Sequence, residues 1–214
     1  MLVNREHIVW RGCILVLVFV FIHSVNGGEN QIAVREPEHQ LFSAGTSEFE
    51  LSAGAFFSLD SGYTYRPTIN FAAEKLRVGL MLYNPHGSGL LAGNTELLLE
   101  GFAGQVFAGP GTTIAGGSAL LRYNFIHPRA WVVPYFQVGV GGAYNDIVND
   151  ESQSLLGSED QILLQAGLGA RVPMNNRLSL MVESDLIHLS NGGSTQRNHG
   201  LNCLGGQAGL ALSF

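Results

Sequence analysis

Apolar residues alternate with polar or small residues along most of this 214-residue chain. The odd positions are apolar from Phe49 to Phe57, and the even positions are apolar from Leu76 to Leu82. A period of two places successive side chains on opposite faces of a β-strand. Six further segments have a similar pattern and a suitable length: residues 96–103, 113–125, 131–141, 161–172, 178–190 and 204–214. The pattern therefore predicts eight β-strands.

The arrangement of these strands is typical of a transmembrane β-barrel. Such barrels have an even number of antiparallel strands with one apolar and one mixed face, and glycine suits a narrow, crowded interior. The predicted connections 126–130 and 173–177 are short, as periplasmic turns are, whereas 143–160 and 191–203 are long, as external loops are. We therefore predict an all-β fold, an eight-stranded antiparallel transmembrane β-barrel formed by residues 46–214.

A soluble up-and-down barrel such as a lipocalin would show the same alternation, with its apolar face turned inward. The charge content argues against it, because only 13% of the residues are charged, about half the usual share of soluble domains. The chain ends on Phe214, with Leu210 and Leu212 at alternate positions before it. This ending resembles that of bacterial outer-membrane proteins, whose last strand is read by the assembly machinery. We therefore expect the bacterial outer membrane as location and its assembly machinery as a partner.

Residues 1–27 have the organisation of a secretory signal peptide. Arg5 and Arg11 precede the apolar run Cys13–Ile22, and small residues end the segment. Ten apolar residues are too few to cross a bilayer as a helix. A retained N-terminal anchor is the alternative interpretation. Residues 28–45 are polar and irregular, and are interpreted as an N-terminal lead-in to the barrel.

The charged residues suggest structural roles. The net charge is −6 and no basic residues cluster, so a nucleic-acid partner is not expected. Acidic residues gather in 146–160, where solvation of an external loop is the simpler interpretation and divalent-ion bridging to lipid phosphates the alternative. Ion pairs inside the barrel or at its rims are expected of the following residues: Glu48, Glu50, Glu96, Glu100, Arg77, Arg122 and Arg171.

The other chemically reactive side chains give no sign of a metal or cofactor. His188 and His199 have no further partners at metal-ligand spacing, so we expect neither a metal nor a cofactor. His199 is interpreted as a solvated loop residue. Cys203 is interpreted as a small buried apolar residue.

The residues that could support catalysis lie in 183–202, ESDLIHLSNGGSTQRNHGLN. His188 and Ser190 lie two apart on a predicted strand, so both project from its lipid-facing side, whereas Glu183 and Asp185 face the interior. A histidine beside a serine supplies a base for a nucleophile, which is the minimum for acyl transfer. The pair by itself is common in proteins, and two interfacial polar residues are the simpler interpretation.

Four further residues complete the string H-L-S-N-x6-N-x-G-x-N: Asn191, Asn198, Gly200 and Asn202. This string, between the last two strands of an exported barrel, resembles the lipid A 3-O-deacylase (PagL) family. Members hydrolyse the ester of the 3-hydroxyacyl chain at the 3 position of lipid A. The resemblance implies lipopolysaccharide as substrate, Ser190 as nucleophile and His188 as general base. It also places Asn191 and Asn198 around the oxyanion, where N–H donors stabilise the developing charge.

One position departs from the family pattern, because well-known members have a glutamate where this chain has Asn202. By parity Asn202 faces outward beside His188, and it is preferred to Glu183 and Asp185 as the residue that orients the imidazole. An asparagine can fix the tautomer but cannot stabilise an imidazolium by charge, so a slower enzyme is expected.

The alternative function is a non-enzymatic small outer-membrane barrel acting in adhesion or envelope integrity. The sequence leaves a homodimer open.

Overall fold

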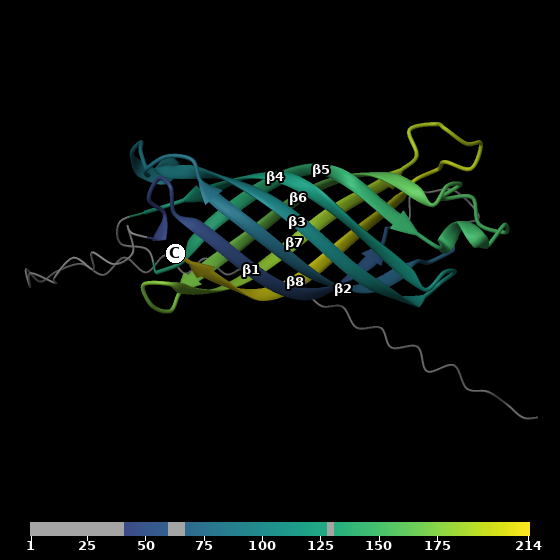
Figure 1. Cartoon of the computed structure of the whole chain (residues 1–214), viewed down its shortest axis with the longest axis horizontal. Coiled ribbons are helices and arrows are strands. Elements are labelled where there is room, and N and C mark those ends of the chain that lie inside the picture. Colours follow the sequence, from purple (N-terminus) through teal and green to yellow (C-terminus); the bar gives the residue numbers. More distant parts are fainter. Residues whose placement is uncertain (1–40, 60–66, 128–130) are drawn as a thin grey trace, which may run out of the picture. The chain divides into compact units, whose positions relative to one another are not determined.

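A computed structural model describes residues 41–59, 67–127 and 131–214 and arranges them as a closed antiparallel barrel (Figure 1). Each strand pairs with the next in sequence and β8 pairs with β1, which closes the sheet. The strands are β1 (Ser47–Ser58), β2 (Asn70–Met81), β3 (Gly93–Ala108), β4 (Thr113–Phe125), β5 (Val133–Asn145), β6 (Asp160–Pro173), β7 (Leu178–Ser190) and β8 (Leu201–Ser213). The predicted fold class is confirmed.

Some predicted features fall outside the described residues. The predicted signal peptide, residues 1–27, lies entirely outside them, and so does the predicted lead-in up to residue 40. Within the described ranges, no helix is long and apolar enough to cross a membrane.

Several strands are longer than the apolar alternation predicts. β3 extends over Gly93–Ala108, beyond the predicted 96–103, because its polar and glycine-rich ends also find partners on β2 and β4. Trp131 was expected inside a strand, but β5 begins at Val133, where pairing with Arg171 of β6 starts. Backbone pairing, and not the alternation of apolar residues, thus sets the ends of these two strands.

The two faces of the barrel have opposite polarity. Along β7, Leu180, Val182 and Leu186 point outward and are 42–52% exposed, whereas Glu183 and Asp185 point inward and are buried. An apolar outer wall around a polar interior is the reverse of a lipocalin, and it is what a lipid environment requires. The soluble-barrel alternative is therefore wrong.

Charged side chains fill the middle of the interior, as the sequence predicts. Four cations lie among six carboxylates: Lys75, Arg77, Arg122 and Arg171 among Glu48, Glu50, Glu96, Glu100, Glu183 and Asp185. The oxygens of Glu48, Glu50 and Glu96 lie within 4.8 Å of one another. Arg122 and Arg171 form ion pairs with these carboxylates, so guanidinium groups offset much of the negative charge of the cluster.

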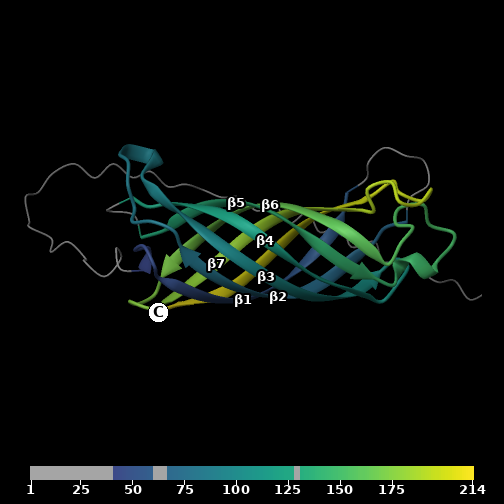
Figure 2. The same ribbon diagram turned by 45° about the horizontal axis from the view of Figure 1, so that its top comes forward.

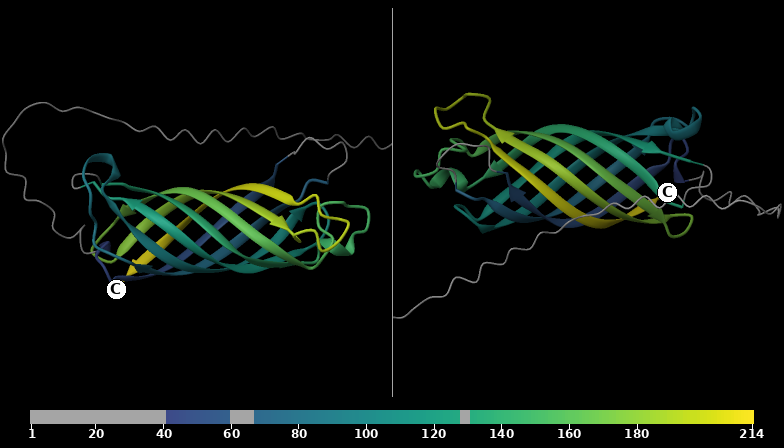
Figure 3. Two further views of the ribbon diagram at one scale, coloured as in Figure 1. Left: turned by 90° about the horizontal axis from the view of Figure 1, so that it is seen from above. Right: turned by 180° about the vertical axis from the view of Figure 1, so that it is seen from behind.

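The barrel has two different ends. The connections 146–159 and 191–200 lie at one end, called here the loop end, and the C-terminus lies at the opposite, turn end (Figure 2, Figure 3). Apolar side chains close both. Leu41 and Phe42 belong to the predicted lead-in, yet they are buried at the turn end. The loop-end cluster comprises, among others, Ile147, Leu155, Leu156, Leu189 and Leu201.

Candidate active site

The structure brings His188, Ser190 and Asn202 to the outer face of two adjacent strands. His188 lies directly opposite Asn202 in the β7–β8 ladder, and Ser190 is the last residue of β7. All three side chains are half-buried, and none points into the barrel. The site therefore lies on the outer wall at the loop end, where the barrel would meet membrane lipid.

The imidazole of His188 is held by Asn202. Its Nδ1 lies 2.8 Å from Asn202 Oδ1. An amide oxygen only accepts hydrogen bonds, so Nδ1 is the donor in this contact, and in a neutral imidazole Nε2 is then the nitrogen with the lone pair. This is the tautomer that a general base needs, because the atom that takes the proton from a nucleophile must be unprotonated.

Gly200 supports the other edge of the same ring. Its φ is +74°, a left-handed backbone conformation that residues other than glycine rarely adopt. A Cβ at this position would lie 2.8 Å from Cε1 and 3.6 Å from Nε2 of His188. Gly200 belongs to the string found in the sequence, but nothing in the sequence indicates this contact with the imidazole.

Ser190 is not yet bonded to its expected base. Among the described residues, its hydroxyl makes no hydrogen bond to His188 or to another group. Catalytic hydrogen bonds often tighten only when substrate binds. Both side chains leave the same face of β7 two residues apart.

The two asparagines expected near the oxyanion have different environments. Asn191 is buried, and its amide binds the loop itself: Nδ2 donates to Thr195 Oγ1 at 2.6 Å, and Oδ1 accepts from Gly193 N. The backbone N–H of Asn191 donates to Asn198 Oδ1 at 2.9 Å. This bond engages the amide oxygen of Asn198 and leaves its Nδ2 without a partner among the described residues. Of the two residues, Asn198 is therefore the one whose side-chain N–H donor is not already used within the loop.

The nearby acidic residues belong to the interior. Asp185 Oδ2 lies 2.7 Å from Lys75 Nζ, and Glu183 forms a two-pronged pair with Arg77. Both are on the face of β7 opposite His188. Cys203 is likewise buried and inward-facing. None of these side chains contributes to the outer site.

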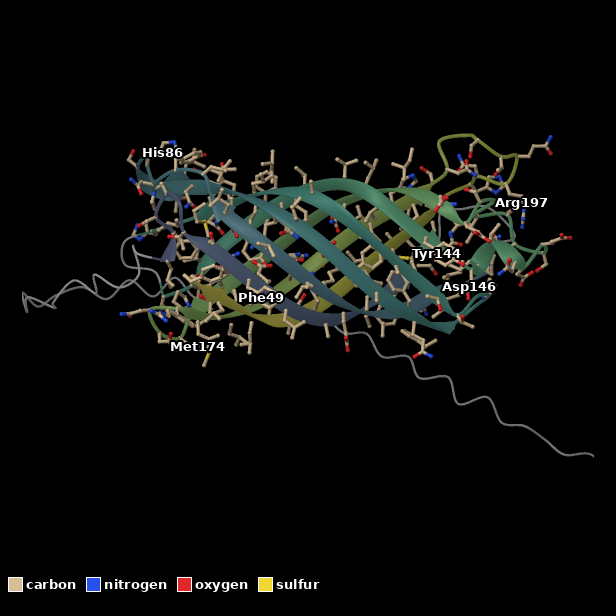
Figure 4. All side chains as sticks on the ribbon, viewed as in Figure 1. Phe49, His86, Tyr144, Asp146, Met174 and Arg197 are labelled. Carbon is tan, nitrogen blue, oxygen red and sulfur yellow. The ribbon has the colours of Figure 1, made fainter. Side chains whose placement is uncertain are left out.

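Two of the acidic residues of loop 146–159 organise the loops. Asp146 and Arg197 both lie at the loop end, far from His86 and Met174 (Figure 4). Asp146 accepts hydrogen bonds from Thr112 and Thr113. Slight burial raises its pKa, but these bonds bring it below its usual value. Asp150 similarly accepts bonds from the Ser152 side chain and backbone.

A family model now connects this geometry with known proteins. The model of lipid A 3-O-deacylase (PagL) matches residues 74–211, well over half of the chain, and that range includes all five predicted site residues. The chain belongs to the lipid A 3-O-deacylase (PagL) family. The family membership implied by the string is confirmed, and with it the location in the bacterial outer membrane.

Solved structures share the PagL-family barrel fold. The crystal structure of the outer membrane enzyme PagL is 18% identical, with a TM-score of 0.51 over 76% of this chain and 97% of that chain. Neisserial surface protein A is 14% identical, with a TM-score of 0.53 over 79% of this chain and 99% of that chain. A search of curated proteins finds no match. At these identities, the two structures establish the fold only.

Outer-membrane location leads to a first prediction. The protein should fractionate with the outer membrane, and the folded barrel should migrate differently on a denaturing gel before and after boiling. The physical reason is its closed ladder of backbone hydrogen bonds, which leaves no edge strand for detergent to open. Recovery as a soluble periplasmic protein with unchanged migration would contradict this placement.

Proposed function

We propose that this PagL-family protein is a serine esterase that removes the 3-O-linked 3-hydroxyacyl chain from lipid A of lipopolysaccharide. The observation that carries the proposal is the 2.8 Å contact between His188 Nδ1 and Asn202 Oδ1 on the outer wall. It prepares His188 as a base two residues from a serine, at a surface that faces lipid. A lipid substrate embedded in the same membrane reaches such a site without being extracted.

The proposed reaction has two stages. Ser190 Oγ attacks the ester carbonyl carbon while His188 Nε2 takes the hydroxyl proton, which gives a tetrahedral intermediate. The intermediate collapses, and the alcohol at the 3 position of lipid A leaves with the proton from His188. Water then attacks the acyl-serine carbonyl with His188 again as base, and the bond to Ser190 Oγ breaks. Ser190 Oγ regains its proton from His188, and the free 3-hydroxy fatty acid is released. No cofactor takes part in these steps.

The oxyanion of the intermediate needs N–H donors placed before the reaction begins. We assign this role to Asn198 Nδ2, because Asn198 Oδ1 is held by the backbone N–H of Asn191. Asn191 then acts indirectly, by fixing the loop through Thr195 and Gly193. Loss of one oxyanion donor typically lowers turnover by about 10²- to 10³-fold.

Lipid A from cells with and without the protein provides the test. Mass spectrometry should detect loss of one 3-hydroxyacyl chain only when the intact protein is expressed. Detection of the released hydroxy fatty acid in the same samples would show that the ester is hydrolysed. Unchanged lipid A, with a folded barrel in the outer membrane, would instead favour the non-enzymatic barrel.

Asn202 allows a second prediction, because it replaces the family's acidic residue. Asn202→Ala removes the acceptor that holds Nδ1, so turnover should fall as the imidazole loses its fixed tautomer. Asn202→Glu should maintain or increase turnover, since an ionised carboxylate also stabilises the imidazolium. The gain should be larger at higher pH, where the introduced carboxylate is ionised. Turnover by purified, refolded variants across a pH series measures both effects.

Two inward-facing acids serve as controls for the Asn202 variants. Glu183→Gln and Asp185→Asn change carboxylates on the opposite face of the same strand, so they should have little effect on turnover in barrels that remain folded. If either one abolishes turnover while Asn202→Ala does not, then Asn202 is not the residue that orients His188.

A further inference from the structure

The side chain of Gln153 organises the connection between β5 and β6. It is 2% exposed, and its Nε2 donates to the carbonyl of Leu156 at 2.6 Å and to that of Ile147 at 3.5 Å. Its Oε1 accepts from the backbone N–H of Leu155 at 2.8 Å and of Leu156 at 3.0 Å. One buried amide thus supplies both donors and acceptors to loop 146–159.

This loop packs on the strands that hold the proposed site. Leu155 and Leu156 are buried in the same apolar cluster as Leu189 and Leu201. Leu189 lies between His188 and Ser190 on β7, and Leu201 precedes Asn202 on β8. The interior side of the site is therefore packed against the loop that Gln153 organises.

The same loop also holds the backbone next to the site. The carbonyls of Ser154 and Leu155 accept from His199 N at 3.3 Å and from Gly200 N at 3.0 Å. The Arg197 guanidinium donates to the carbonyls of Asp150 and Val148. The connections 146–159 and 191–200 are therefore linked by backbone and side-chain bonds at the loop end.

Gly200 connects the loop that Gln153 organises with the imidazole of His188. Its backbone lies so close to His188 that a Cβ would be 2.8 Å from Cε1, while Asn202 binds Nδ1 on the other side. The ring is thus held at two points. One of them, Gly200, is bonded to the Leu155 carbonyl, and that carbonyl belongs to the same peptide unit as the Leu156 N–H that donates to Gln153 Oε1.

From these contacts, and resting on the function proposed above, we infer that Gln153 is a positioning residue for the general base His188. It does not touch the reacting atoms. It acts through Leu155 and Gly200, and keeps the imidazole in the position that Gly200 and Asn202 define. A displacement of about 1 Å in a catalytic group can cost on the order of 10²-fold in rate, so a small shift of Gly200 is enough to matter.

The test replaces Gln153 with methionine, which keeps the length of the side chain but loses its four hydrogen bonds. In the refolded full-length protein with lipid A in mixed micelles, Gln153→Met should lower kcat by about 10- to 100-fold. KM should change by less than about threefold, because the residue does not contact substrate. Gln153→Glu keeps the two accepting bonds but places a carboxylate oxygen against the carbonyls of Leu156 and Ile147. It should therefore also lower kcat, and it carries the same test if Gln153→Met fails to fold.

Asp146→Ala is the matched control. It removes hydrogen bonds from the same loop, but those bonds connect to Thr112 and Thr113, away from Gly200. Its kcat should stay within about twofold of the parent. Equal losses in Asp146→Ala and Gln153→Met, or a Gln153→Met enzyme within twofold of the parent, would overturn the inference.

A spectroscopic measurement separates this inference from the proposed function. Isotope-labelled imidazole nitrogens of His188 should report a single Nδ1–H tautomer in the parent and an averaged ring in Gln153→Met. This readout needs no turnover, so it applies even if lipid A is not the substrate. Unchanged His188 signals in Gln153→Met would overturn the positioning role while leaving the esterase proposal intact.

Discussion

Ser190→Ala and His188→Ala should each abolish release of the acyl chain from lipid A in a barrel that stays folded. The nucleophile and its base act as one unit, so removing either costs about as much as removing both, on the order of 10⁴- to 10⁶-fold in kcat. The two residues lie on the outer wall and take no part in the interior ion pairs. The variants should therefore keep the heat-modifiable migration of the parent while losing turnover of purified lipid A.

Two substitutions elsewhere on the barrel control for nonspecific damage. Ser184→Ala removes another outward hydroxyl of β7, which donates to the carbonyl of Gly205 at 3.1 Å. His86→Ala removes a histidine at the turn end (Figure 4). Both should retain full turnover. Full activity of Ser190→Ala or His188→Ala would place the chemistry elsewhere on the molecule.

The strand pattern made much of the site predictable. A period of two fixes which face each side chain occupies, so the outward placement of His188, Ser190 and Asn202 follows once β7 and β8 are recognised as strands. That His188 and Asn202 lie directly opposite one another depends on the register of the β7–β8 ladder. The string in the sequence points to the same neighbours by resemblance.

Contacts formed by the loops were not predictable in this way. The packing of Gly200 against His188 and the hydrogen bonds of Gln153 depend on how two irregular connections fold over the loop end. Irregular segments have no periodicity that assigns a side chain to a face. The burial of Leu41 and Phe42 was missed for the same reason, because a short apolar pair in a polar segment gives no pattern.

The interior network was predicted as ion pairs, but its density appears only in the structure. Arg77, for example, contacts three carboxylates, those of Glu50, Glu100 and Glu183. Its Nε lies 2.7 Å from Glu100, and its Nη2 lies 2.8 Å from Glu183. The residues come from β1, β2, β3 and β7, so Arg77 joins strands across the barrel interior. Such bonds are specific because the planar guanidinium fits carboxylates in a two-pronged geometry.

Arg77→Met should therefore destabilise the folded barrel strongly. The substitution leaves carboxylates buried without their cation, and breaking a buried pair from one side costs about 3–5 kcal/mol. Arg77→Lys should lose less, since it keeps the charge but not the two-pronged bond to Glu183. Urea unfolding of the refolded barrel in detergent, followed by the heat-modifiable band, measures the difference in unfolding free energy.

Arg177→Met is the matched control, because Arg177 is an exposed residue of the turn between β6 and β7. Its effect should stay within about 0.5 kcal/mol, as expected of surface substitutions. Adding Glu183→Gln to Arg77→Met removes one of the unpaired charges, so the double variant should be more stable than the sum of the single effects predicts, by about 0.5–3 kcal/mol. Equal stability of Arg77→Met and Arg177→Met would mean that water or protonation replaces the lost cation, and that the network does not hold the barrel together.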